Sequence, residues 1–91
     1  MLNVCWLPAA RDDLAAIITY LAERSPSAAR SLRQRIERAV LPATGYPYLH
    51  RPGRVPGTRE VVVHPSYVVV YRITHNALQV VSVLHTRRAY P

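Results

Sequence analysis

The most apolar part of the chain is residues 57–73, where two runs of β-branched and aromatic residues flank a short His-Pro-Ser break. Runs of this kind around a break that contains proline predict a β-hairpin, with strands at about 58–64 and 67–73. Both runs are almost continuously apolar, which is typical of strands that are central in a sheet or covered on both faces. We therefore expect the other elements to pack around this hairpin.

Apolar positions ahead of the hairpin recur with helical spacing. A first stripe predicts a helix over residues 8–23, with Asp12 and Asp13 in its first turn, where they favour the helix dipole; its members are Ala10, Leu14, Ile17, Ile18 and Leu21. Ser25 and Pro26 are a typical N-cap and first helical residue. A second helix is expected to follow them and to end near Leu41, before Pro42; its stripe is Ala29, Leu32, Ile36, Ala39 and Val40. The short link predicts an antiparallel helical hairpin.

Two more strands complete the pattern, one at residues 2–7 and one at 78–85, after a turn at His75 and Asn76. Regular alternation in the last strand places Leu78, Val80, Ser82 and Leu84 on one face, and Gln79, Val81, Val83 and His85 on the other. Residues 42–57, rich in proline, glycine and tyrosine, predict an ordered loop. The order β-α-α-β-β-β predicts an α+β fold in which a helical hairpin packs on an antiparallel sheet, as a single domain over residues 1–91.

The net charge of +7 is carried entirely by arginine, since the sequence has no lysine. A GC-rich genome accounts for that choice, but guanidinium groups still bind phosphates and carboxylates, so we expect an acidic partner, either nucleic acid or an acidic polypeptide. The arginines of the second helix lie off its apolar stripe. Cys5 has no intrachain partner and is expected to be a buried, inert thiol. No apolar run is long enough to span a membrane and no signal peptide is evident, so we expect a cytoplasmic protein.

Several short motifs follow one another at informative spacings. Trp6, Ala10, Asp13-Leu14, Ile17 and Tyr20-Leu21-Ala22 mark the first helix, and Ser25-Pro26 with Ala28-Ala29 open the second. Residues 51–60 (RPGRVPGTRE), 67–71 (YVVVY) and 83–88 (VLHTRR) follow. In this order the chain resembles the RelE/ParE superfamily of toxins from type II toxin–antitoxin modules. The resemblance covers nearly the whole chain.

The resemblance implies one of two activities. RelE-like members are metal-free ribonucleases that cut mRNA, usually in the ribosome, whereas ParE-like members share the fold and poison DNA gyrase. The ribonuclease branch often has an arginine after the tyrosine that matches Tyr67, and a basic residue at the position of Thr86; here the first position is Val68. The segments Gly57–Glu60 and Val83–His85 look more like ParE. We therefore favour a gyrase poison, with an mRNA endoribonuclease as the alternative.

Metal-free RNA cleavage needs a base, an acid and cations around the scissile phosphate. If the chain is a ribonuclease, its candidate catalytic residues are His64, His85, Arg87 and Tyr90. The candidate target contacts in either case are Arg59, Arg72, Arg87 and Arg88. For histidines at such positions, a solvated or structural role is the commoner case. A metal site and a cofactor are not expected, because no carboxylate stands at ligand spacing from the histidines.

Two kinds of partner follow from charge and from the resemblance. A plain RNA- or DNA-binding module is a third hypothesis from charge alone, but the sequence shows no aromatic platform spaced as in known single-strand binders. Under both toxin hypotheses the resemblance implies a cognate antitoxin. An apolar groove between helical hairpin and sheet, on a domain of charge +7, suits an acidic, partly disordered segment that wraps the toxin and folds on binding.

Overall fold

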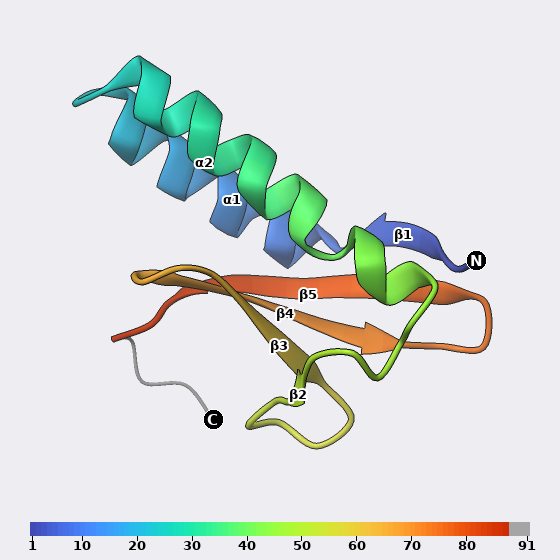
Figure 1. Ribbon diagram of the computed structural model, residues 1–91. Helices are drawn as coiled ribbons and strands as arrows, with labels where there is room; N and C mark the ends of the chain where they lie inside the picture. Colours follow the sequence, from blue (N-terminus) through green and yellow to red (C-terminus); the bar gives the residue numbers. More distant parts are fainter. Residues whose placement is uncertain (88–91) are drawn as a thin grey trace.

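The computed structural model describes residues 1–87 of the chain. It has two layers, a helical hairpin lying over one face of a five-stranded sheet (Figure 1), which confirms the α+β fold class and the predicted order of the two helices and the four longer strands. The sheet differs from the predicted antiparallel one in two ways: it is mixed, and a further short strand forms within the segment expected to be a loop. The elements are β1 (Asn3–Trp6), α1 (Pro8–Ala22), α2 (Pro26–Ala39), the 3₁₀ helix η1 (Leu41–Thr44), β2 (Arg51–Pro52), β3 (Arg59–His64), β4 (Tyr67–Ile73) and β5 (Ala77–His85). The strand order is β1-β5-β4-β3-β2.

The sheet is mixed, because β1 pairs with β5 in parallel while the other pairs are antiparallel. The chain leaves β1 through the two helices and continues through the β3–β4 hairpin. The next strand, β5, then lies beside β1 and runs in the same direction. Cys5 lies on this edge strand and is exposed. The prediction of a buried thiol was therefore wrong, since β1 has a neighbour on one side only and Cys5 lies on its outer face.

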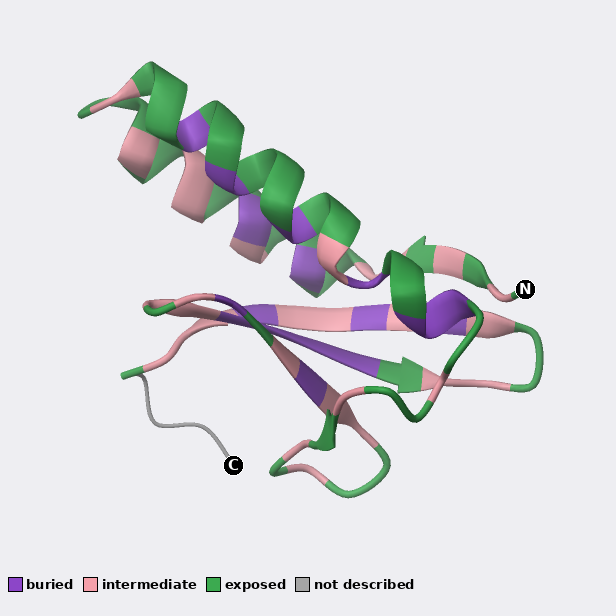
Figure 2. Ribbon diagram, in the orientation of Figure 1, coloured by how far each residue is buried: buried purple, intermediate pink, exposed green. Residues whose placement is uncertain are grey.

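Both helices begin as their sequences predict. Pro8 and Pro26 each stand at the start of a helix, and the Ser25 hydroxyl accepts a hydrogen bond from the Ala28 N–H at 3.3 Å. The second helix ends at Ala39, two residues before the predicted Leu41, because Pro42 lies inside the 3₁₀ turn that follows. Buried positions form one stripe along each helix, facing the other layer (Figure 2).

The β3–β4 hairpin occupies the middle of the sheet. Residues 68–71 of β4 are all buried, as expected for a central strand. In β3 only Glu60 and Val63 are buried and Val62 is 54 % exposed, so continuous burial of the kind expected for both strands is found in β4 alone. The difference arises because β3 has only the two-residue β2 outside it.

A β-bulge at Val81 changes which side chains of β5 face the helices. Val80 pairs with Tyr71 and Ser82 pairs with Val70, so Val81 has no partner on β4. Beyond it, Val83 lies in the core between sheet and helices at 2 % exposure. The predicted grouping of Leu84 with Val80 was therefore wrong, because the sequence pattern assumed unbroken alternation.

Residues 45–50 are fastened to the end of the sheet by one buried ring. Tyr71 is fully buried and its hydroxyl donates to the Pro47 carbonyl at 3.5 Å. Burial raises the pKa of Tyr71 above its usual 10. The charge of Arg59 and a hydrogen bond with the His50 backbone act in the opposite direction and limit this rise. His50 meets Tyr71 edge to face at 6.0 Å, and burial lowers the pKa of its imidazole below 6.5. The loop is thus ordered, as its composition predicted.

The segment between β2 and β3 folds around a buried carboxylate. Glu60 is 4 % exposed, forms an ion pair with Arg51 at 3.3 Å and accepts the Arg54 N–H at 3.1 Å. No helix in the described part of the chain is long and apolar enough to cross a membrane.

Candidate functional site

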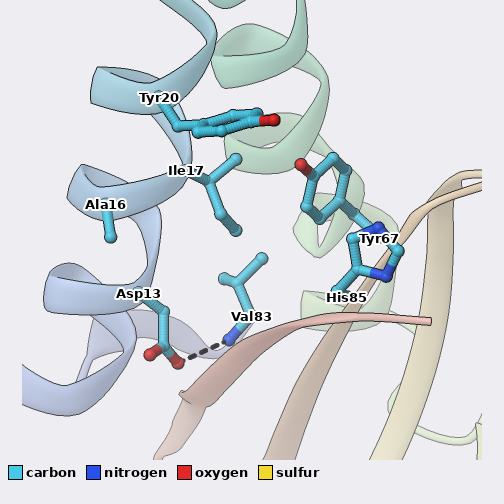
Figure 3. Close-up of a pocket in the computed structure, with 7 residues that line it drawn as sticks. All are labelled: Asp13, Ala16, Ile17, Tyr20, Tyr67, Val83 and His85. Carbon is cyan, nitrogen blue, oxygen red and sulfur yellow. Dashed lines mark hydrogen bonds between the residues drawn. The ribbon is translucent and has the colours of Figure 1, made fainter. Parts of the chain in front are cut away.

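The helical hairpin and the sheet enclose a cleft near the tip of the helices. In Figure 1 the helices rise away from the sheet toward the α1–α2 turn, so the layers are furthest apart there. A hollow of about 370 Å³ lies on one side, between α1 and the end of β5 (Figure 3). It is lined by Asp13, Ala16, Ile17, Tyr20, Tyr67, Val83 and His85.

A second hollow, of about 300 Å³, lies on the α2 side and is lined by Leu21, Ala28, Ser31, Leu32, Arg35, His64 and Tyr67. The Tyr67 ring borders both hollows, so together they form one groove divided by Tyr67, which we call the cleft. Its walls are mostly apolar, with histidine at the sheet side and the Arg35 guanidinium donating to the Val63 carbonyl at 3.3 Å. The groove expected between helical hairpin and sheet is therefore present.

Two of the candidate catalytic residues line the cleft. His64 ends β3 and His85 ends β5, and their rings lie on either side of Tyr67, with centroid distances of 5.8 and 5.4 Å. Each imidazole is held by the backbone, since Nδ1 of His64 accepts the Ser66 N–H at 3.0 Å and Nδ1 of His85 accepts the Arg87 N–H at 3.2 Å. A neutral ring that accepts at Nδ1 carries its proton on Nε2.

The chain beyond β5 is attached to the hairpin turn. The Thr86 N–H donates to the Ser66 carbonyl at 2.8 Å, and its hydroxyl donates to the Pro65 carbonyl at 2.9 Å. Arg87 is thereby kept beside His85 with its side chain exposed. The other two candidates on this segment, Arg88 and Tyr90, lie outside the described residues.

Arg59 and Arg72 lie away from the cleft. Arg59, at the start of β3, donates to the His50 carbonyl at 2.7 Å and places its guanidinium 4.7 Å from the centre of the Tyr48 ring. Arg72, near the end of β4, is exposed and donates through Nε to Gln79 at 2.7 Å. The structure therefore groups His64, His85 and Arg87 at one end of the sheet, and Arg59 and Arg72 at the other.

Asp13 lines the cleft, and its role differs from the predicted interaction with the helix dipole. The helix begins at Pro8, so Asp13 lies in the second turn, and no acidic residue stands in the first. Its carboxylate instead accepts the Val83 N–H at 3.0 Å, joining α1 to β5 (Figure 3). The strand β1 pairs with β5 only as far as Val80, which leaves Val83 on an edge without a neighbouring strand. Nothing local in the sequence signals this contact.

Tyr67 was also missed as a site residue, although it stands in the motif that carries the resemblance. Among residues 1–87, no three metal-ligating side chains of His, Cys, Asp or Glu gather where they could hold an ion. The site is therefore a mostly apolar groove with aromatic and imidazole donors at its sheet side and an exposed arginine at its mouth.

The two-layer fold and its cleft fit the RelE/ParE class of small toxins that the sequence resembles. The same fold occurs in a chromosomal ParDE toxin–antitoxin system from P. aeruginosa, with a TM-score of 0.81, 24 % identity and coverage of 93 % of this chain and 96 % of that one. The match is to the fold.

Sequence comparison narrows the class to a family. The model of the ParE toxin of the type II toxin–antitoxin system parDE matches residues 4–90. The chain is 33 % identical over 88 residues to the toxin RelE2 of Caulobacter vibrioides, covering 97 % of this chain and 99 % of that protein. It is also 33 % identical over 90 residues to Y4kP of Sinorhizobium fredii, covering 98 % and 93 %. The chain belongs to the ParE toxin family of type II toxin–antitoxin systems.

Proposed function

We propose that this toxin stops growth by poisoning DNA gyrase, acting as a binding protein that stabilises the cleaved DNA–enzyme complex. The observation that carries the proposal is the way the backbone holds His64 and His85. With Nδ1 of each ring accepting a backbone N–H, Nε2 bears the proton and can only donate. A general base for the 2′-hydroxyl needs an unprotonated ring nitrogen within reach of substrate.

The positions of the arginines support the same interpretation. Val68, where the ribonuclease branch often has arginine, is 4 % exposed in the sheet and offers no charge. Arg59, at the start of β3, and Arg72, near the end of β4, lie at the end of the sheet opposite the two histidines. Of the described candidate cations, Arg87 alone stands beside the two histidines.

The test is a supercoiling assay with purified full-length toxin, plasmid, gyrase and ATP, scored for lost supercoiling and for trapped linear DNA. We expect both, and we expect His64→Ala and His85→Ala each to retain them if they remain folded. A single histidine variant that is folded yet inactive would count against a purely binding role. Intact supercoiling at saturating toxin, from a protein that stops growth in cells, would refute gyrase as the target.

The clustering of His64, Tyr67 and His85 supports an mRNA endoribonuclease as the second candidate, because two imidazoles and a phenol lie together along the open cleft. If the toxin cleaves mRNA, removing one acid–base histidine is expected to lower the cleavage rate by about 10²–10⁴-fold. Primer extension on mRNA from induced cells, compared between wild type and His85→Ala, would show the cleavage. Uncut mRNA at saturating toxin would exclude this candidate.

We also propose that the cleft binds the antitoxin. The bound part of the antitoxin would be an acidic, partly disordered segment that folds on binding. The apolar walls formed by Ile17, Leu21 and Leu32 suit an amphipathic segment, while Arg35 and the exposed arginines suit its carboxylates. Affinity is therefore expected to fall as salt rises, because exposed ion pairs are screened. Affinity that does not change with salt would show that apolar burial alone holds the complex. Gyrase and mRNA are both cytoplasmic, so we propose that location for the toxin.

A further inference from the structure

Charge is divided unevenly along the chain. From Arg38 onward the sequence contains one acidic residue, Glu60, and this carboxylate is buried and paired with Arg51. The other four acids precede Arg38, and Asp12, Glu23 and Glu37 are exposed on the helices. From residue 51 to residue 87 the strands and their loops consequently carry arginine and no exposed acidic side chain; the arginines are Arg51, Arg54, Arg59, Arg72 and Arg87.

Within this basic half, one loop exposes large apolar side chains. Tyr46 is 73 % exposed, Tyr48 is 75 % exposed and Leu49 is 55 % exposed. We call residues 46–50 the tyrosine loop. The loop is nevertheless anchored to the sheet, because the buried Tyr71 donates a hydrogen bond to the Pro47 carbonyl and Arg59 donates one to the His50 carbonyl. Two aromatic rings are thus held out toward solvent on a fixed support.

A hollow of about 330 Å³ adjoins this loop and is lined by Tyr48, Pro52, Gly57, Thr58, Arg59 and Ile73. That volume lies in the range of small-ligand pockets. Its outline depends on the turn at Gly57, whose φ of +83° is in the left-handed region that favours glycine. Arg59 supplies a cation at the wall of the hollow, and its guanidinium lies 4.7 Å from the centre of the Tyr48 ring.

We propose that the tyrosine loop and this hollow bind single-stranded nucleic acid. Unpaired bases stack on Tyr46 and Tyr48, one base enters the hollow beside Tyr48, and Arg59 at the wall of the hollow contacts a phosphate. Exposed aromatic rings beside a basic groove are the combination by which proteins hold single strands without reading sequence. An acidic polypeptide would satisfy the arginines but would leave the two exposed ring faces without flat partners.

This surface is separate from the cleft. It lies where β3 begins and β4 ends, at Arg59 and Ile73, whereas the cleft lies where β3 ends and β4 begins, at His64 and Tyr67. An antitoxin seated in the cleft therefore leaves the tyrosine loop accessible. The proposal is independent of the target of the toxin, and a negative gyrase assay would not affect it.

The test measures fluorescence anisotropy of a labelled oligothymidylate of about 12 nucleotides with full-length toxin. The informative pair is the double variant Tyr46→Ser/Tyr48→Ser against Tyr46→Phe/Tyr48→Phe, which keeps both rings and loses only the hydroxyls. We expect the serine pair to bind at least about tenfold more weakly, and the phenylalanine pair to bind like wild type, since stacking needs the ring. Circular dichroism and urea unfolding establish that both variants are folded.

A charge pair completes the design. Arg59→Gln is expected to reduce the dependence of affinity on salt, because each phosphate contact contributes to that slope, whereas Arg30→Gln at an exposed position of α2 leaves the slope unchanged. An oligouridylate of equal length identifies the preferred sugar, and the same serine-to-phenylalanine contrast with either polymer supports the proposal. Equal binding by the serine and phenylalanine pairs, tighter binding of a duplex, or displacement by polyglutamate as effective as by oligonucleotide would each overturn it.

Discussion

Replacing Asp13 by alanine tests how the cleft is held open at its α1 side. The Asp13 carboxylate accepts the Val83 N–H at 3.0 Å, across 70 residues of sequence, and it is the hydrogen bond that ties the second turn of α1 to β5. A hydrogen bond to a charged group contributes about 1.5–3 kcal/mol to stability. Because the Asp13 side chain is only half-buried, we expect a loss near the lower end of that range, about 1–2 kcal/mol.

Asp12 provides a matched control because it is the neighbouring carboxylate on the same helix and is exposed. Alanine is the better helix former at both positions, so the difference between Asp13→Ala and Asp12→Ala cancels the change in helix propensity and isolates the contact. Asp13→Asn retains an acceptor oxygen without the charge, and its loss should fall between those of the two alanine variants.

The assay is urea unfolding followed by circular dichroism, with thermal melts as a second measure. For a domain of this length, 1 kcal/mol corresponds to a shift in Tm of about 4–8 °C. Asp12→Ala is expected to stay within about 0.5 kcal/mol of wild type. Equal free energies of unfolding for Asp13→Ala and Asp12→Ala, within experimental error, would show that the bond to Val83 adds nothing to stability and would refute its role in joining α1 to β5.

Three further variants probe the core, a cap and a titrating side chain. Ile36→Ala removes a fully buried side chain and is expected to cost about 2–5 kcal/mol in urea unfolding, against almost no change for Arg30→Ala on the same helix. Ser25→Ala removes the acceptor for the Ala28 N–H and is expected to cost about 1 kcal/mol; an unchanged Tm would show that the cap is not used. Burial lowers the pKa of His50 in the folded state, so the unfolded chain takes up the proton first and stability falls as pH drops below about 6.5. His50→Phe, which keeps an aromatic ring against Tyr71, should flatten the change in unfolding free energy between about pH 7 and pH 5, and a slope equal to that of wild type would contradict the assignment.

Local patterns were enough to predict most elements of the fold. Both helices, the β3–β4 hairpin and the order of elements follow from periodicity, from the Ser25-Pro26 signal and from the His-Pro-Ser turn, because each depends on residues close in sequence. The burial of Cys5 could not be predicted in the same way. Whether a strand lies at an edge depends on which strands pair with it, and β1 pairs with a strand at the far end of the chain.

In the candidate site, too, the features set by local sequence were predicted and those set by long-range contacts were not. His64 and His85 each end a strand, and the structure places them at one end of the sheet on either side of Tyr67. Arg59 was chosen for its charge, but its guanidinium is directed at the His50 carbonyl and the Tyr48 ring. Composition gives the number of arginines and not their partners, so the use of each one is decided by long-range contacts. The tyrosine loop was overlooked for the corresponding reason, since sequence alone does not show which aromatic residues stay exposed.

The bulge at Val81 explains why the cleft has its present lining. Under unbroken alternation, Leu84 would face the helices with Val80, and Val83 and His85 would face the opposite side of the sheet. Because Val81 is left unpaired, every side chain after it changes face, so that Val83 enters the core and His85 reaches Tyr67. The same stretch of β5 lies beyond the end of β1, where its outer edge is open to the Asp13 carboxylate. One extra residue therefore places the imidazole in the cleft, while the short partner strand leaves the Val83 N–H for the helix to bind.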